Sequence, residues 1–379
     1  MIQELPQARR HAAGLAALKA SHACGVLRTA MLTLALSLPQ GLLALPIAVA
    51  QVGVVPGMLT ILLFGALNTI TVAWAAREVA ASGARHGVVP SLTQLAYERL
   101  GPRGGLLTLG SGAALFFLAL LASVVGLARS LAELTGAPAP VWGLGCGLGI
   151  LTLVLRRASL GSRLLIGLGL LNVGLLVALL LLMLPHLGPM AAPAPAGGSP
   201  LAMAGVSLML FFAPMLVAPV ASHVLPQGHA PRTLVWGSAA GVAGGAALFG
   251  LWAAGVCSVV GAANLAGATG TAVPALLAAL PQARLPGLLL GLVLLGMTAL
   301  RCALVLGALG DERLPRSMCG LRRRLCAQLP TCLSLALALG CLSAGATSFT
   351  QLVAVAGIAT ASLTSLVVPA MLRRQSAVS

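Results

Sequence analysis

The stretch Leu38-Pro39-Gln40-Gly41-Leu42 interrupts an apolar segment that is long enough to cross a membrane. A second interruption, Phe211-Phe212-Ala213-Pro214-Met215, stands in another such segment far along the chain. Proline has no backbone N–H and collides with the carbonyl four residues earlier, so each stretch leaves helical backbone groups without partners. Inside a bilayer those groups need partners from the protein or from a bound solute.

The composition around these stretches is that of a protein embedded in lipid. The 379 residues are 59% hydrophobic and 7% charged, whereas soluble domains are about 25% charged. A helix needs about 20 apolar residues to cross a hydrocarbon core of about 30 Å. We therefore expect an all-α polytopic membrane protein with about ten transmembrane helices. The predicted spans are 29–52, 54–76, 104–128, 138–155, 162–185, 200–222, 233–259, 286–310, 326–344 and 348–372.

The basic residues test this number of spans, since cytoplasmic loops collect Lys and Arg. Of the 22 Lys and Arg, 19 fall on one side when the spans alternate, Arg129 and Arg284 fall on the other, and Arg301 lies inside a span. A missed helix would invert every later loop. We therefore expect a multi-pass protein of the bacterial cytoplasmic membrane with both termini in the cytoplasm. Because topology explains the net charge of +16, we expect no nucleic-acid partner.

Ten spans divide into two sets of five, and the two interrupted segments are then the first member of each set. In transporters built from inverted repeats, the solute site lies where corresponding helices are broken near the midplane. The expected organisation is a cytoplasmic tail at 1–28, a five-helix repeat at 29–185, an extracytoplasmic loop at 186–199, a second five-helix repeat at 200–372 and a cytoplasmic tail at 373–379.

The two breaks offer groups that suit a zwitterionic solute. The positive end of a half-helix that starts near Gly41 suits a carboxylate, and freed carbonyls suit an amine or a cation. The eighth segment adds Arg301, with Thr298 one turn earlier on the same face. An intramembrane arginine is costly and suggests a function, although it can also pair with carbonyls for structure alone. A threonine hydroxyl can likewise bond back to its own helix.

Two further features of the sequence concern the packing of helices and the pairing of charged side chains. Gly237, Gly241 and Gly245 recur every four residues in the seventh segment, which predicts that another helix packs closely there. Glu78 stands beside Arg77 at the inner end of the second segment, where we expect an ion pair.

The sequence lacks the motifs for enzymatic hydrolysis, for ATP-driven pumping and for metal binding. The chain has no His-Glu-x-x-His pair, no membrane-buried carboxylate pair and no Walker sequence, so we expect neither an enzyme nor an ATP-driven pump. The eight cysteines are scattered, without a Cys-x-x-Cys pair or a histidine at ligand spacing. We therefore expect no metal and no cofactor.

The run Gly41-Leu42-Leu43-Ala44-Leu45-Pro46, followed by Ala48 to Gln51 and Gly53, resembles the first helix of the amino acid/auxin permease family. It is equally similar to the related hydroxy- and aromatic-amino-acid permeases of the amino acid-polyamine-organocation superfamily. Further similar positions are Tyr97 to Gly101, Phe212 with Pro219, Asp311, Phe349, Gly357, Pro369, Ala370 and Met371.

This resemblance implies the leucine-transporter-type 5+5 inverted repeat with broken helices 1 and 6. It also implies alternating access and amino acid uptake coupled to protons or sodium. Family members bind the amino and carboxyl groups of the solute at the two breaks. Carried over, this points to Pro39, Gln40, Gly41, Leu42, Phe212, Ala213 and Pro214, and with Met215, Thr298 and Arg301 these are the candidate substrate-binding residues.

The chain also departs from the family. Pro39-Gln40-Gly41 stands where the family has Gly-x-Gly, which bears on the shape of the carboxylate pocket. Sodium-coupled members hold the ion with a Ser/Thr pair on helix eight, whereas only Thr298 is evident here and Arg301 can take the electrostatic role of sodium. We therefore expect proton-coupled symport or uniport. Two alternatives stay open: a carrier of another small, anionic solute that uses Arg301, and a non-transporting membrane sensor or scaffold.

Overall fold

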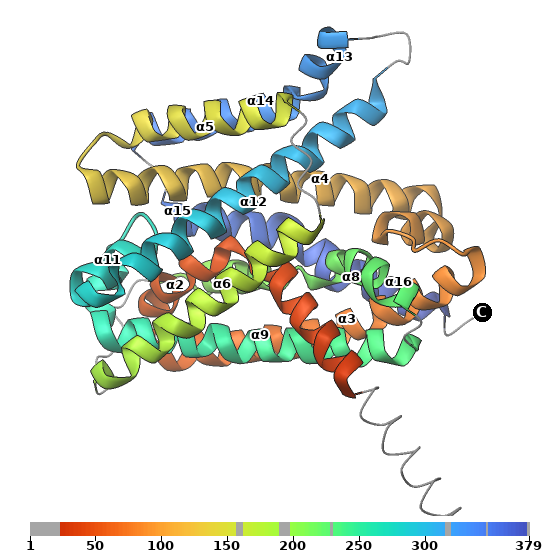
Figure 1. The fold of residues 1–379 in the computed structure, drawn as a ribbon, viewed down its shortest axis with the longest axis horizontal. Helices are drawn as coiled ribbons and strands as arrows, with labels where there is room; N and C mark the ends of the chain where they lie inside the picture. The colour runs from red at the N-terminus through yellow and green to blue at the C-terminus, as the bar shows by residue number, and fades with distance from the viewer. Residues whose placement is uncertain are drawn as a thin grey trace, which may run out of the picture.

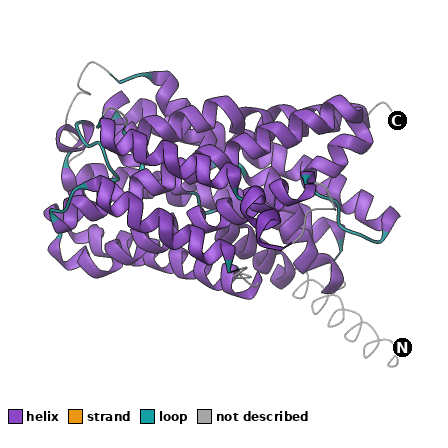
Figure 2. Ribbon diagram, turned by 90° about the horizontal axis from the view of Figure 1, so that it is seen from above, coloured by secondary structure: helices purple, strands orange, loops and turns teal. Residues whose placement is uncertain are grey.

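The computed structural model describes residues 23–156, 162–188, 198–227, 230–314, 320–345 and 348–376. Throughout these ranges the regular structure is helical, with no strand (Figure 2). Most of the long helices run along one common direction, so the described chain forms an elongated bundle (Figure 1). Most of the expected N-terminal tail and residues 189–197 of the expected extracytoplasmic loop lie outside the described residues.

Each of the ten predicted segments contains a helical span. Among the described residues, seven helical stretches are long and apolar enough to cross a membrane, and three shorter apolar helices account for the rest. The polytopic class is thereby confirmed. The spans are Ala23–Ser37 with α2 (Leu45–Val52), α3 (Val54–His86), α4 (Leu92–Thr135), α5 (Ala139–Leu155), α6 (Ser162–Met183), α7 (Pro200–Leu210) with α8 (Val217–Val224), α9 (Pro231–Val260), α12 (Arg284–Arg313), α14 (Leu329–Ala344), and α15 (Phe349–Ala356) with α16 (Val368–Ser376).

The first span is broken where the sequence predicts. Helix Ala23–Ser37 starts before the expected boundary at residue 29 and ends at the Leu38-Pro39 pair. Pro39 is extended, with φ −95° and ψ 154°, and the chain then forms the short 3-10 helix η1 (Gln40–Leu43) before α2 begins. Pro46 lies in the first turn of α2, where its missing N–H breaks no helical bond.

The sixth span is broken in the same manner. Helix α7 ends at Leu210, and Phe211 leaves the helical region with φ −116° and ψ 48°. The chain continues through the 3-10 helix η3 (Ala213–Leu216), which has Pro214 in its first turn, into α8. The prediction of broken helices 1 and 6 is therefore confirmed.

The tenth span is also irregular, which the sequence does not predict because residues 348–368 contain no proline. Between α15 and α16 the backbone forms two π-helical turns, η6 (Gly357–Ala361) and η7 (Leu363–Val367). Gly357 lies directly against the carbonyl oxygen of Gly205 on α7. The sixth and tenth spans are therefore so close that a side chain at residue 357 would not fit.

The segment between α9 and α12 does not cross the bundle. It forms α10 (Ala262–Ala266), α11 (Ala272–Ala279) and η5 (Pro281–Ala283). Three hydrogen bonds fix it to the ends of α2, α4 and α15: Gln51 Nε2 to Ala266 O at 3.1 Å, the Ser130 and Thr271 hydroxyls at 2.7 Å, and Phe349 N to Thr269 O at 2.9 Å. The remaining short helices are η2 (Leu184–His186), η4 (Leu225–Gln227) and α13 (Gly320–Ala327).

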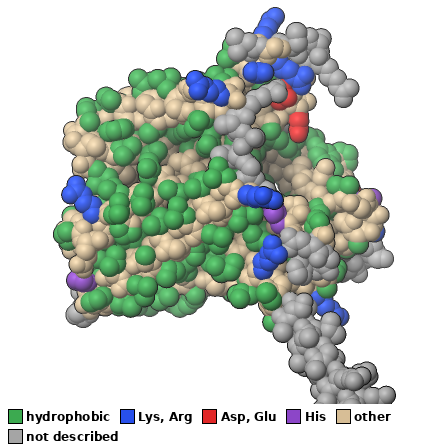
Figure 3. Space-filling view, in the orientation of Figure 1, with side chains coloured by type: hydrophobic (Ala, Val, Ile, Leu, Met, Phe, Trp, Pro, Cys, Tyr) green, Lys and Arg blue, Asp and Glu red, His purple; other side chains and the backbone are tan. Residues whose placement is uncertain are grey.

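The surface is mainly apolar along the bundle and basic toward one end. In Figure 3 most of the visible Lys and Arg side chains lie to the right and at the top, while the broad remainder of this face carries hydrophobic side chains. Such a distribution suits a protein whose sides face lipid and whose basic end faces the cytoplasm.

The glycine stripe of α9 packs against helix Ala23–Ser37, as the spacing of four predicts. Gly237 lies against Thr29, and a Cβ added at Gly241 would stand 2.6 Å from Ala30 O. Gly245 completes the stripe, with Leu34 Cδ1 at 3.3 Å from such a Cβ. The close approach holds the first half of the broken first span in place.

We expect Gly241→Ala to destabilise the protein, because its methyl group would meet the backbone of helix Ala23–Ser37. Overpacking of this kind costs about 1–3 kcal/mol, which we expect to lower the apparent melting temperature in detergent by at least about 2 °C. Gly244→Ala is the matched control, because a Cβ there meets nothing within 4 Å. Equal melting temperatures for the two variants would contradict this contact.

Candidate functional site

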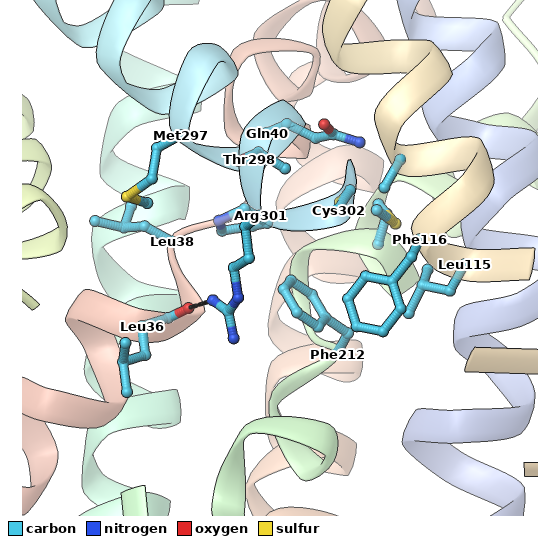
Figure 4. A pocket seen from close by; sticks show the side chains of 13 residues that line it. Leu36, Leu38, Gln40, Leu115, Phe116, Phe212, Met297, Thr298, Arg301 and Cys302 are labelled. Atoms are coloured by element: carbon cyan, nitrogen blue, oxygen red, sulfur yellow. Dashed lines mark hydrogen bonds between the residues drawn. The ribbon is translucent and has the colours of Figure 1, made fainter. Parts of the chain in front are cut away.

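A small cavity lies where the two broken spans meet α4 and α12 (Figure 4). Its volume of about 30 Å³ is room for about two water molecules. A solute as large as an amino acid therefore does not fit here unless the lining side chains move. The lining residues are Leu36, Leu38, Pro39, Gln40, Leu115, Phe116, Ala119, Met209, Phe212, Met297, Thr298, Arg301 and Cys302.

Half of the ten candidate residues line this cavity. Pro39 and Gln40 come from the first break, Phe212 from the second, and Thr298 and Arg301 from α12. Three elements that are far apart in the sequence thus place their polar and aromatic side chains around one point.

The other five candidates do not line the cavity. A Cβ at Gly41 would meet Val353 and Leu210 at ordinary contact distance, so this residue faces α15 and α7. Ala213 and Pro214 are buried, and the methyl group of Met215 would lie 3.1 Å from a Cβ at Gly112. The fifth, Leu42, is fully buried and serves the fold through its backbone, as described below.

Arg301 caps the broken first span. Its Nη1 donates a hydrogen bond to Leu36 O at 3.2 Å (Figure 4), in the last turn of helix Ala23–Ser37, where carbonyls have no helical partner. An arginine at the bilayer centre costs about 2.5–3.5 kcal/mol on insertion scales, and a hydrogen bond from a charged group returns about 1.5–3 kcal/mol. This one bond therefore offsets most of that cost.

The charge of Arg301 is not neutralised by the cavity wall. None of the residues that line the cavity is acidic. A guanidinium has five N–H donors, and the bond to Leu36 O uses one of them. The cavity therefore presents positive potential and spare donors.

Gln40 adds a second polar group. Its side chain is fully buried, and its Oε1 accepts a hydrogen bond from Ser123 Oγ on α4. Its Nε2 has no hydrogen-bond partner among the described residues. Because an unpaired buried amide costs about 1–3 kcal/mol, this donor is a group that a bound solute or water would satisfy.

The Thr298 hydroxyl bonds back to its own helix, which is one of the two possibilities that the sequence left open. Its Oγ1 donates to Leu294 O of the same helix at 2.7 Å, so the hydroxyl proton is already used. Only the lone pairs of this oxygen remain for a solute or an ion.

The backbone of the first break finds partners on α9. Trp252 Nε1 donates to Leu42 O at 3.0 Å, and Cys257 Sγ lies 3.5 Å from Pro46 O. Sequence reasoning missed both residues, because a buried tryptophan or cysteine in an apolar helix carries no sign of what its polar atom faces. It also missed the wall contributed by α4 through Leu115, Phe116 and Ala119, where only helical rotation decides which side chains face inward.

We expect Gln40→Met to leave the protein as stable as wild type or slightly more stable, because the unpaired Nε2 disappears and Ser123 keeps Ala119 O as its acceptor. Trp252→Phe is the contrasting control, since it leaves Leu42 O unpaired and should cost about 1–3 kcal/mol. Thermal denaturation in detergent measures both changes. A Gln40→Met protein that melts as early as Trp252→Phe would show that the amide is satisfied in the fold.

The chain is similar in fold to a transporter of known structure. The match is to Mhp1, a nucleobase-cation-symport-1 family transporter in a closed conformation with bromovinylhydantoin bound. It covers 86% of this chain and 74% of Mhp1, with a TM-score of 0.51 and 14% sequence identity. No protein-family model and no curated protein matches the sequence. The fold comparison confirms the leucine-transporter-type 5+5 inverted repeat, with its first and sixth helices broken.

Proposed function

We propose that this chain is a secondary transporter that moves an amino acid across the bacterial cytoplasmic membrane by alternating access. The observation that carries the proposal is the convergence of both broken spans and α12 on one cavity. Irregular backbone at membrane depth is stable only where it is buried in protein or lines a cavity. In this fold, a paired interruption around a polar cavity is what a solute site requires.

The polarity of the cavity favours a solute with a carboxylate. The spare donors of Arg301 and the free Nε2 of Gln40 suit its two oxygens. An amino group would need a backbone carbonyl at one of the breaks. The apolar part of the wall, which includes Phe116, Met209 and Met297, suits an aliphatic or aromatic side chain.

The two halves of the proposed transporter are residues 29–185 and 200–372, each starting with its broken span. The excess of basic residues on one side of the spans supports an orientation with both termini in the cytoplasm. The cavity volume of about 30 Å³ means that a solute enters only after the bundle opens. Alternating access supplies such an opening, because this closed state would exchange with states open to either side.

We propose that transport does not use sodium, because Arg301 already brings a fixed positive charge to the carbonyl of Leu36. We therefore expect uptake into proteoliposomes to be unchanged, within about twofold, when choline replaces sodium on both sides. An imposed proton gradient distinguishes symport, which it accelerates, from uniport, which it leaves unaffected. Uptake that requires a sodium gradient would overturn this assignment.

A second candidate is a carrier for a small anion, which the absence of acidic residues from the cavity lining favours. Because Mhp1 holds bromovinylhydantoin, solutes other than amino acids also belong in the test. A thermal-shift screen of the purified protein against amino acids, organic anions, nucleobases and hydantoins identifies the ligand, since a ligand that binds the folded state raises its apparent stability.

We expect Arg301→Gln to lower amino acid uptake at least about tenfold, because the site loses its charge and Leu36 O loses its partner. If the solute is an amino acid, the variant keeps the wild-type preference for zwitterions over anions. A selective loss of anion uptake would instead identify the second candidate. Arg284→Gln, at the exposed start of the same helix, is the matched control and should transport normally. Ligand binding without flux in every preparation would indicate a sensor.

A further inference from the structure

A groove of about 630 Å³ lies on the outside of the bundle between the end of α3 and the start of α9. The two helices pack against each other in opposite directions, since Gly65 faces Ala246 and Met58 faces Gly250. The groove is separate from the cavity at the broken spans and shares no residue with it. Its lining consists of Arg77, Ala80, Ala81, Ala84, Pro231, Arg232, Val235 and Trp236.

Two arginines face this groove without an acidic partner among the described residues. Sequence position suggested a pair between Arg77 and Glu78, but the structure pairs the Glu78 carboxylate with Arg99 at 3.8 Å instead. The ion pair expected for Glu78 is therefore present, but its partner is Arg99, because neighbouring residues on a helix point in directions about 100° apart. Arg77 and Arg232 are both exposed, one on each wall of the groove.

The groove continues a stripe of exposed apolar side chains on α3. Leu59, Leu63 and Ile70 are 62%, 58% and 48% exposed, and their helical spacing places Arg77 on the same face. Across the groove, Trp236 is 62% exposed, and tryptophan favours the level of the lipid headgroups. The surface therefore changes from apolar to basic along one line, as a lipid changes from acyl chain to headgroup.

We propose that this groove binds the headgroup of an anionic phospholipid, with its phosphate between Arg77 and Arg232 and its acyl chains along the stripe on α3. Arginine forms strong, charge-assisted hydrogen bonds with phosphate oxygens, and basic pockets between transmembrane helices are established headgroup sites. Helix α9 begins at Pro231 without a side-chain cap, so the positive end of its dipole adds to the attraction. The inference is independent of what the protein transports.

The test measures phosphatidylglycerol binding to the full-length protein by native mass spectrometry, with phosphatidylcholine as the neutral lipid. Because each basic residue near a membrane surface changes the affinity for anionic lipid about fivefold, we expect Arg77→Gln with Arg232→Gln to weaken phosphatidylglycerol binding by roughly 25-fold. Binding of phosphatidylcholine should not change. Melting temperatures measured in phosphatidylcholine nanodiscs verify that the double variant is folded.

The control removes the same charge from outside the groove, through Arg156→Gln with Arg163→Gln, two exposed arginines near the loop between α5 and α6. We expect this protein to bind phosphatidylglycerol within about twofold of wild type. An equal loss in both double variants would overturn the proposal, since it would indicate a diffuse basic surface. Competition by glycerol 3-phosphate at the concentration of the lipid would also overturn it, because the groove would then be a site for free phosphate.

Discussion

The requirement that backbone polar groups find partners inside the hydrocarbon governs this structure. An intact transmembrane helix meets it by itself, whereas the breaks in the first and sixth spans do not. The protein supplies missing partners from neighbouring spans: Trp252 for Leu42 O and Arg301 for Leu36 O. Each partner ties a different part of the first break to α9 or α12. The breaks are therefore fixed structural features, and a solute does not have to satisfy all of the groups that they expose.

The side-chain groups of the cavity that still lack a hydrogen-bond partner are donors. The lining of the cavity offers the donors of Arg301 and Gln40, while the hydroxyl proton of Thr298 is committed to its own helix. A donor-rich, carboxylate-free cavity attracts an anion or the carboxylate end of a zwitterion. The same arginine that stabilises the break therefore also adds positive potential to the cavity.

The features that could be predicted from sequence are those that depend on local residues alone, such as a helix break or the length of a span. Proline in the middle of an apolar run, as at residues 39 and 214, interrupts the helix, and apolar runs of sufficient length become spans. The glycine spacing of α9 likewise predicts a close neighbour in any arrangement. By contrast, the contributions of Phe116 and Trp252 depend on how α4 and α9 are rotated, and apolar segments carry little signal for rotation. The π-helical turns around Ser362 arise from packing against other spans, which no local pattern in residues 348–368 indicates.

The segment between α9 and α12 is attached to the bundle by interactions that are weak enough to be reversed. At one end of the bundle, the segment containing α10 and α11 is fixed by Gln51, by the Ser130 and Thr271 hydroxyl pair and by the amide of Phe349. Three hydrogen bonds of this kind contribute together about 1.5–4.5 kcal/mol. This contribution is smaller than the about 5.5 kcal/mol of differential binding that inverts a two-state equilibrium from 1:99 to 99:1. In the alternating-access cycle proposed above, solute binding can therefore supply enough free energy to release this segment.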